Sequence, residues 1–342
     1  MMLAVLLAIA LPAMADPRPC AGQPPLDSSV RASLIRHVSP LLDSTPHPPA
    51  RVHTEGLLPH EGIRDESIEV ERELPLMRDA ALAWRAGAGD AYLKMATRYL
   101  DAWVTTYHPD FNPIDETNFD ALIDTYTLIQ QAMPPANKAR ATQFLRAWAQ
   151  GYVERTHDAR KAHDHRGSWQ NNWQSHRVKL VTLIAVALED AQLFTEAREL
   201  YREQVAQNLR PDGEPIDFAE RDALHYVVYD LEPLLRAALA ARSRGENWYA
   251  ADIHGASLET SVRWLRPYAA GEKQHEEFVH STVAFDAKRA AIGAKGYAGP
   301  FDPKTAANVY WMASEFDAAY RALAQRLRSQ PPTDRYVCAA KD

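Results

Sequence analysis

Two stretches of the sequence bring together side chains that could take up negative charge and move protons. The first, residues 167–177, contains two tryptophans, two adjacent asparagines and a histidine. Asn172 and His176 are four residues apart, so they would share one face of a helix. Amide and imidazole groups can hydrogen-bond a carboxylate without a metal, and the rings of Trp169 and Trp173 could pack flat against a sugar. The alternative is an asparagine that caps a helix, with buried tryptophans as anchors.

The second stretch, residues 221–233, places a cation, an imidazole and two phenols on one predicted helix. His225 and Tyr229 are four residues apart, and Tyr226 lies five residues after Arg221. An unperturbed tyrosine has a pKa of about 10, so it needs positive charge nearby to act as a base near neutrality. Arg221 or a histidine could supply that charge. The alternative is two aromatic core residues and an arginine paired with a neighbouring aspartate.

Histidines elsewhere give weaker indications of chemistry. His53 lies in an irregular loop that could form the wall of a cleft or could simply be solvated. The spacings between His157, His163 and His165 are six and two residues, which match no helical metal-binding pattern such as H-E-x-x-H. We therefore expect no metal site.

Apolar residues recur every three or four positions along most of the chain, which predicts helices. No run of alternating β-branched residues predicts a sheet. Short Gly- and Pro-containing loops between the helices predict consecutive antiparallel helix hairpins in an all-α fold. Because no repeat of fixed period occurs, a closed or nearly closed ring of helix pairs around a central cleft fits best. The predicted helices span 29–42, 76–86, 90–107, 118–133, 137–155, 172–188, 193–208, 219–242, 257–268, 275–292 and 303–328.

The composition is that of a globular protein. The 342 residues are 46% hydrophobic and 24% charged, which excludes a disordered chain. The formal net charge of −7 argues against a general nucleic-acid-binding protein. An anionic partner would therefore need positive charge concentrated in the cleft, near Arg51, Arg177 and Arg221.

The two ends of the chain carry features of an exported protein. Residues 2–15 are a short apolar run that ends in Ala13-Met14-Ala15, which fits a secretory signal peptide. We expect a periplasmic or secreted protein without a membrane span. Cys20 and Cys338 predict a disulfide that ties the ends of the mature chain together. The predicted organisation is a signal peptide at 1–15, a leader with an irregular cleft-wall loop at 16–75, a helical domain at 76–330 and a C-terminal tail at 331–342.

Three features, in this order, resemble the alginate lyase superfamily of exported helical polysaccharide lyases. They are the helix start at Asn171-Asn172-Trp173, the turn Pro211-Asp-Gly213, and the helix that carries Arg221, Leu224-His225-Tyr226, Tyr229 and Leu231. The resemblance covers residues 76–267, more specifically 169–233. It implies an (α/α) toroid and β-elimination on a uronate polymer, without a metal or other cofactor. One departure is that the best-known branch has adjacent Asn and His at the helix start, where this chain has Trp173 and places His176 a turn later.

The resemblance and the residues together assign roles in such an elimination. A uronate has a weakly acidic hydrogen at C5, next to its carboxylate. Asn172, His176 and Arg221 are expected to neutralise that carboxylate, and Tyr226 is expected to act as base and acid, with Tyr229 as the alternative tyrosine. The expected partner is an anionic polysaccharide or oligosaccharide, such as alginate, polymannuronate or a glucuronan-like chain, bound by a monomer. The expected substrate-binding residues are Asn171, Trp169, Trp173, His225, Tyr229, His53 and Arg177.

Two other functions fit the same fold class. A glycoside hydrolase on an (α/α) barrel would need two carboxylates that flank the scissile bond, and Asp115 with Glu116 or Glu214 with Asp217 are available. A non-catalytic periplasmic protein would bind oligouronates without consuming them. The products separate the three possibilities, because only a lyase creates an ultraviolet-absorbing double bond.

Overall fold

The structure, a computed structural model, describes residues 26–164 and 166–337. Within these residues the regular structure is helical and only isolated β-bridges occur, which confirms the all-α prediction. The α-helices are α1 Ser28–Val38, α2 Arg64–Val70, α3 Glu73–Arg85, α4 Asp90–Thr106, α5 Asp120–Ile129, α6 Pro135–Lys161, α7 Asn172–Ala187, α8 Ala191–Asn208, α9 Ile216–Arg221, α10 Leu224–Arg242, α11 Leu258–Ala269, α12 Ala284–Ala291, α13 Ala307–Ala313 and α14 Arg321–Leu327.

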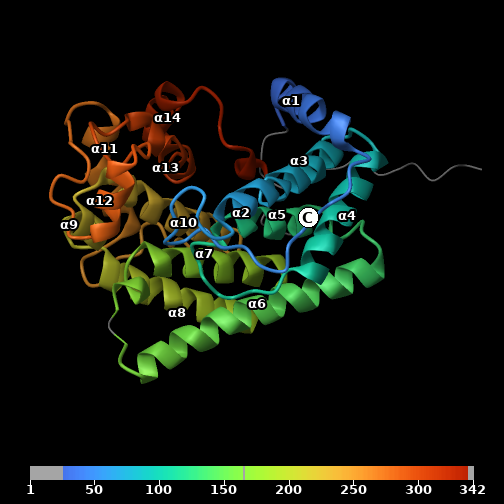
Figure 1. The fold of residues 1–342 in the computed structure, drawn as a ribbon, viewed down its shortest axis with the longest axis horizontal. Helices are drawn as coiled ribbons and strands as arrows, with labels where there is room; N and C mark the ends of the chain where they lie inside the picture. The colour runs from blue at the N-terminus through green and yellow to red at the C-terminus, as the bar shows by residue number, and fades with distance from the viewer. Residues whose placement is uncertain (1–25, 165, 338–342) are drawn as a thin grey trace, which may run out of the picture.

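Helix α7 forms the centre of the molecule. It packs most extensively against α10 and α8, and it also contacts α5 and α6. Figure 1 shows α7 in the middle of the ribbon, with α8 and the long α6 on one side of it. Almost every residue of α7 is buried, including the polar residues of its first two turns. A helix surrounded on all sides has no solvent face, so these polar side chains must find partners inside the protein.

The hairpins around α7 are held by apolar and aromatic packing. Helix α3 packs against α4 and α5, and α4 packs against α6. The ring of Phe119 meets Trp103 edge-on at 5.4 Å between centroids and Trp148 at 5.9 Å. Gly151 of α6 lies against Phe111, and a Cβ at this position would fall 2.1 Å from a ring carbon. This close approach, which only glycine permits, holds the loop after α4 against α6.

Three predicted helices are wrong in their extent. The predicted helix 219–242 is two helices, because Asp222 adopts a left-handed conformation with a φ of 48° and ends α9 before α10 begins. Of the predicted helix 275–292, only the part in α12 is helical. The predicted helix 303–328 is divided into α13, α14 and short 3-10 helices. The leader at 16–75, which was predicted to contain an irregular cleft-wall loop, also contains α2 and the start of α3.

The loop before α12 explains why the predicted helix 219–242 is broken at Asp222 and why the first part of 275–292 is not helical. Its backbone bonds to the end of α9: the Phe278 N–H donates to the Asp222 carbonyl at 2.8 Å, and the Thr282 N–H donates to the Glu220 carbonyl at 3.0 Å. The Asp222 carboxylate also accepts from the His280 N–H at 2.9 Å. Backbone groups must be paired somewhere, and partners this far away in the sequence do not show in a helical periodicity.

The described parts of the leader and the tail are folded onto the helical domain. Helix α1 packs against α3. Near the other end, Arg236 donates to both oxygens of Asp124, at 2.8 and 2.9 Å, and Arg78 donates to Thr333 at 3.4 Å. Arg78 through Thr333, and Arg236 through Asp334 at 3.6 Å, link the 3-10 helix Thr333–Tyr336 to the core.

The predicted signal peptide at 1–15 and the two cysteines, Cys20 and Cys338, lie outside the described residues. Among the helices of the described ranges, none is long and apolar enough to cross a membrane.

Candidate active site

Two asparagines at the start of α7 have different tasks. Asn171 is the N-cap, and its Oδ1 accepts from the backbone N–H of the half-buried Trp173 at 3.1 Å. Asn172 is buried, and its side-chain Nδ2 and backbone N donate to Asp217 at 2.5 and 2.8 Å. Burial raises the pKa of Asp217 to about 6, although the bonds from Asn172 oppose the rise. Asn171 therefore serves the helix, whereas Asn172 is oriented by Asp217.

His176 lies one turn further along α7 and has only 3% of its surface exposed. Its Nδ1 lies 2.7 Å from the Thr117 hydroxyl, and in the part of the chain that the structure describes its buried Nε2 has no hydrogen-bond partner. Burial lowers the pKa of His176 well below its usual value, and the Lys179 cation adds to this effect. The ring is therefore neutral near pH 7. It lies 4.3 Å, centroid to centroid, from the ring of Tyr229 on α10.

Tyr226 of α10 lies between two guanidinium groups. Arg289 of α12 donates from Nη1 to the Tyr226 hydroxyl at 2.9 Å, and the Arg221 guanidinium lies 3.8 Å from the centroid of the ring. Burial raises the pKa of Tyr226, and the two arginines oppose that rise. Arg221 is itself held by Asp286, which accepts from Nη1 at 2.7 Å. Over the described residues the buried Nε of Arg221 has no partner.

Tyr229 stands between the imidazole and the arginines. Both tyrosines belong to α10, and the ring of Tyr229 meets that of Tyr226 edge-on at 6.3 Å between centroids. Tyr229 is half-buried, whereas Tyr226 is 7% exposed. Burial raises the pKa of Tyr229, and the neighbouring phenols and carboxylates reinforce the rise. We use the name tyrosine cluster for Asn172, His176, Arg221, Tyr226, Tyr229 and Arg289.

Residues 275–300 border the tyrosine cluster, and their contribution was not predicted from the sequence. Besides Arg289, this segment supplies Tyr297, whose ring centroid lies 4.8 Å from the Arg289 guanidinium and 5.5 Å from the His225 ring. The carboxylate of Glu277 accepts from the His225 backbone N–H at 3.2 Å. Burial lowers the pKa of His225 to about 4, so its ring is neutral near pH 7. The one signal in the sequence was an arginine at the end of a segment predicted to be a continuous helix.

Two expected substrate-binding residues lie together on the opposite side of α7. Gln174 is two residues from both Asn172 and His176, so it points about 200° away around the helix axis. Arg177 donates to the Gln174 Oε1 at 3.1 Å, and its guanidinium lies 4.0 Å from the centroid of a Trp169 ring. Trp169 and Gln174 line an open pocket of about 190 Å³ there. The structure thus brings Trp169 and Arg177 to each other but not to the tyrosine cluster.

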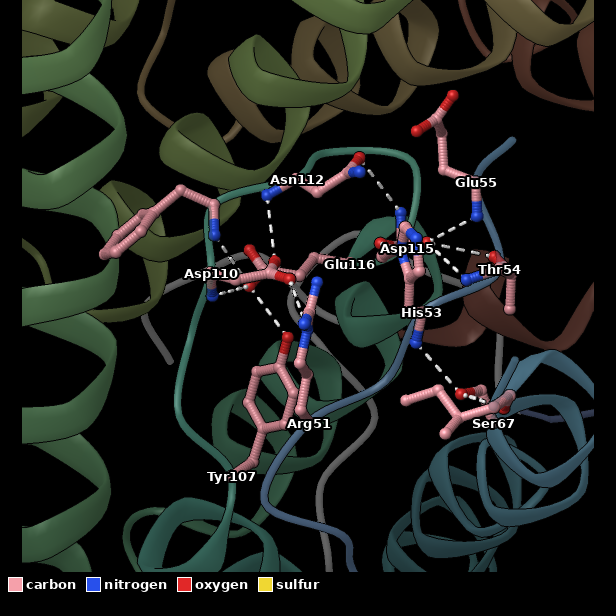
Figure 2. A network of polar contacts seen from close by, with 12 residues as sticks. Arg51, His53, Thr54, Glu55, Ser67, Tyr107, Asp110, Asn112, Asp115 and Glu116 are labelled. Carbon is pink, nitrogen blue, oxygen red and sulfur yellow. Dashed lines mark hydrogen bonds and ion pairs between the residues drawn. The ribbon is translucent and has the colours of Figure 1, made fainter. Parts of the chain in front are cut away.

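His53 belongs to a separate network around Asp115, shown in Figure 2. Its Nδ1 lies 2.7 Å from Asp115 Oδ2, while Oδ1 accepts from the backbone N–H groups of Thr54 and Glu55 at 2.7 and 2.8 Å. The His53 N–H donates to the Ser67 hydroxyl at 2.9 Å, which ties this loop to α2. Asp115 therefore holds the loop in place.

Glu116, the next residue, is enclosed by donors on α6 and on the segment that follows α4. We use the name acidic cluster for Asp115 and Glu116 with their donors, of which Figure 2 shows those on the loops. Every oxygen of the two carboxylates accepts a hydrogen bond from the protein. Asp115 and Glu116 therefore lack the free oxygen that the acid or base of a glycoside hydrolase needs at a glycosidic bond. The two Glu116 oxygens accept five hydrogen bonds, from the side chains of Tyr107, Trp148 and Tyr152 and from the backbone of Asp110 and Phe111.

The other carboxylate pair is also engaged in local contacts. Asp217 holds Asn172, and Glu214 pairs with Arg210 at 2.5 Å. Of the three arginines expected to concentrate positive charge, Arg51 is exposed and pairs with Asp110 at 3.3 Å, and Arg177 lies across α7. Arg221 alone of the three is in the tyrosine cluster, where Arg289 accompanies it.

Solved structures share this fold. An alginate lyase from Bacteroides ovatus is similar with a TM-score of 0.66 and 17% identity, over 93% of this chain and 94% of that one. Alginate lyase A1-III from Sphingomonas species A1 is similar with a TM-score of 0.56 and 20% identity, over 84% and 89% of the two chains. A variant of A1-III with a tyrosine replaced by phenylalanine, complexed with a tetrasaccharide, gives 0.57 and 18% over 74% of each chain. These likenesses confirm the expected (α/α) toroid.

This is the fold of alginate lyases, which are helical polysaccharide lyases. A family model described as alginate lyase matches residues 32–275, which is more than half of the chain. The chain therefore belongs to the alginate lyase family, as the resemblance in its sequence indicated. A comparison with curated proteins finds no match.

Proposed function

We propose that this chain cleaves alginate, or a closely related polymer such as polymannuronate or glucuronan, by β-elimination at the tyrosine cluster. One observation carries the proposal: α10 holds Tyr226 and Tyr229 with guanidinium groups on one side and a neutral imidazole on the other. Elimination at a uronate needs a base, a proton donor for the leaving oxygen, and donors that take up carboxylate charge. The tyrosine cluster contains a group of each kind.

Arg221, His176 and Asn172 supply the donors for the carboxylate in this proposal. The Arg221 Nε–H forms no hydrogen bond within the described residues, and Asp286 fixes the orientation of the guanidinium. The neutral His176 ring keeps one N–H. Asn172 uses one amide N–H on Asp217 and retains the second. Donors that are already oriented stabilise the charge that develops as C5 loses its proton, because little reorganisation is needed at that moment.

Tyr226 is the base in this proposal. As a phenolate it takes the C5 proton, the electrons of the C–H bond form the C4–C5 double bond, and the C4–O bond breaks. The leaving oxygen then takes that proton from Tyr226, which restores the phenolate. Arg289 and Arg221 favour the charged form, because both cations lie against this phenol. Mannuronate and glucuronate share an axial C5 hydrogen and an equatorial C4 oxygen, so one syn mechanism serves both.

Tyr229 is a second candidate for the base, and a specific contact favours it. Its half-buried ring lies directly against His176, whereas the hydroxyl of Tyr226 is already bonded to Arg289. A proton taken up by Tyr229 would be close to a neutral imidazole donor. In A1-III, the protein complexed with a tetrasaccharide carries phenylalanine in place of one tyrosine, which does not distinguish the two tyrosines of this chain. The two candidates differ in which set of neighbours stabilises the phenolate.

A panel of polymers tests the proposed reaction. Purified protein is incubated with alginate, polymannuronate, glucuronan and glycosaminoglycans, and the absorbance of the unsaturated product is followed. We expect absorbance to rise with alginate or polymannuronate, or with glucuronan. New reducing ends without the absorbance would overturn the lyase mechanism in favour of hydrolysis. Binding without either product would favour a non-catalytic glycan-binding protein.

We also propose that the protein is exported as a monomer to the periplasm or the medium. The apolar run at 2–15 and the Ala13-Met14-Ala15 pattern support export. N-terminal sequencing of the protein from cell fractions tests this, and an uncleaved chain in the cytoplasm would contradict it. Size measured by light scattering tests the monomer.

A further inference from the structure

We propose that Thr117 and Lys179 fix the tautomer of His176, so that Nε2 carries the ring proton and is presented as a ready-made donor. Both are positioning residues, because they act through His176 and do not touch the substrate. This inference rests on the proposed function, since it gives the donor a purpose in binding the uronate carboxylate or the phenolate.

The hydrogen bonds around Thr117 determine which way its hydroxyl points. Lys179 donates from Nζ to the Thr117 Oγ1 at 3.0 Å, to the Thr117 carbonyl at 2.8 Å and to Asp120 at 3.0 Å. An ammonium group has no acceptor, so the Thr117 oxygen must accept from Lys179. Its own hydrogen is left for the remaining contact of this hydroxyl, which is the His176 Nδ1 at 2.7 Å. Nδ1 is then the acceptor, and a neutral ring carries its proton on Nε2.

The surroundings of His176 keep the ring neutral. It is almost completely buried, and the cations of Lys179 and Arg177 further disfavour a second proton. The carboxylate of Asp120 acts in the opposite direction, but it forms an ion pair with Lys179 at 3.0 Å. From α10, Tyr229 faces the imidazole with its ring at 4.3 Å and with its backbone, whose contact favours the charged ring. The imidazole therefore has one N–H, and that nitrogen is buried with no hydrogen bond of ordinary geometry to the described residues.

The local sequence explains why this arrangement is rigid. Lys179 follows His176 by three residues, so both side chains leave the same face of α7 and can reach one hydroxyl. Lys179 is itself 5% exposed, so its ammonium is bound to protein groups. Thr117 begins the 3-10 helix Thr117–Phe119, which the fully buried Phe119 anchors in the core. A donor fixed in this way needs no rearrangement when negative charge arrives.

The first test measures the tautomer itself and needs no activity. Nitrogen-15 NMR of protein labelled at histidine reports which ring nitrogen is protonated, and the His176→Gln variant assigns the signal. We expect an unprotonated Nδ1 and a protonated Nε2 in the wild type and in Thr117→Ser, which keeps the hydroxyl. In Thr117→Val, which is close in shape but lacks the hydroxyl, we expect the Nδ1 signal to move. A wild-type ring protonated on Nδ1, or an unchanged signal in Thr117→Val, would overturn the inference.

The second test measures the consequence for catalysis. Thr117→Val should lower kcat about tenfold with little change in KM, because a lost orienting hydrogen bond affects charge that develops in the transition state. Thr117→Ser should restore kcat. Full kcat in Thr117→Val would overturn the positioning role even if the tautomer is as expected. If the wild type forms no unsaturated product, the proposed function fails, but the NMR result still decides the tautomer.

Discussion

The tyrosine cluster and the acidic cluster are both buried and polar, but they differ in how completely their atoms are bonded. In the acidic cluster, each oxygen of Asp115 and Glu116 accepts at least one hydrogen bond. In the tyrosine cluster, His176 Nε2, Arg221 Nε and Asn172 Oδ1 are buried without a partner among residues 26–164 and 166–337. The carboxylates of the acidic cluster are fully hydrogen-bonded, whereas the tyrosine cluster keeps two nitrogens and one oxygen without a hydrogen bond.

This difference separates a structural network from a reactive one. Leaving a buried polar atom unpaired costs about 1–3 kcal/mol, so such atoms are rare in folded proteins and call for an explanation. In the tyrosine cluster these atoms lie beside the groups that we propose meet the substrate, and we expect a bound uronate to pair with the donors among them. The fully bonded carboxylates of the acidic cluster instead make a rigid wall for the loops around His53 and Phe111.

The largest effect is expected when the base is removed from the tyrosine cluster. Tyr226→Phe should lower kcat by roughly 10²–10⁴-fold, the usual contribution of general acid–base catalysis, while the melting temperature stays nearly unchanged. Absorbance of the unsaturated product and circular dichroism measure the two quantities. Tyr126→Phe is the matched control, because it removes a hydroxyl bonded to Thr142 in the α5–α6 hairpin. An active Tyr226→Phe beside an inactive Tyr229→Phe would transfer the role to Tyr229.

The opposite result is expected in the acidic cluster. Glu116→Gln should lower the free energy of unfolding by about 3 kcal/mol, because an amide cannot accept all the hydrogen bonds that the two carboxylate oxygens accept. The kcat of the folded enzyme should remain close to that of the wild type. Urea unfolding measures the stability, with Asp101→Asn as a control that breaks only the exposed pair with Arg140, worth about 0–1 kcal/mol. Loss of kcat with intact stability would make Glu116 part of the chemistry.

Glu71 is intermediate between the two clusters, because only one of its carboxylate oxygens is hydrogen-bonded, and it should make the stability of the protein depend on pH. Asn118 donates to one of its oxygens at 2.8 Å, and the other has no partner within the described chain. Burial raises the Glu71 pKa from 4.5 to about 7. A folded pKa above the unfolded one stabilises the protein fully below about pH 4.5, and this contribution is lost as the pH rises to 7.

Glu71→Gln should therefore flatten the decline in the free energy of unfolding between pH 4.5 and 7, by up to ~3 kcal/mol. Urea unfolding across this pH range measures the slope. The exposed Glu66 of α2 supplies the control, since Glu66→Gln should leave the slope as it is. An identical slope in Glu71→Gln would assign the pH dependence to other carboxyl groups.

The smallest effect is expected across α7 from the tyrosine cluster. Trp169→Phe should leave kcat unchanged and alter KM by less than about threefold, because Trp169 packs with Arg177 on the other side of the helix. Initial rates on long and short substrate chains measure this. A larger rise in KM with long chains alone would bring the pocket beside Trp169 into the path of the polymer.

The sequence was sufficient to predict the helical toroid, because apolar periodicity marks the helices and the resemblance to the family supplies their arrangement. The pairs of candidate site residues depend on patterns within one helix. Asn172 with His176, and Tyr226 with Tyr229, are each a helical turn apart, so their placement follows from periodicity. Arg289 and Thr117 lie 63 and 59 residues from the side chains that they contact, and no local pattern encodes such contacts. The break at Asp222 was missed for the same reason, since the partners that stabilise it come from residues 278 and 280.

The family match ends at residue 275, but the chain beyond it supplies Arg289, Asp286 and Tyr297 to the neighbourhood of Tyr226 and Arg221. This segment contains one short helix and glycines with positive φ at 293, 296 and 299, and it is tied to the end of α9 and the start of α10 through Asp222 and His225. For protein engineering, residues 276–300 are a segment to exchange, provided that the partners of Asp222, His225 and Tyr226 are kept. Grafting the corresponding segment of a relative is a route to a different polymer preference while the helices that carry both tyrosines stay intact.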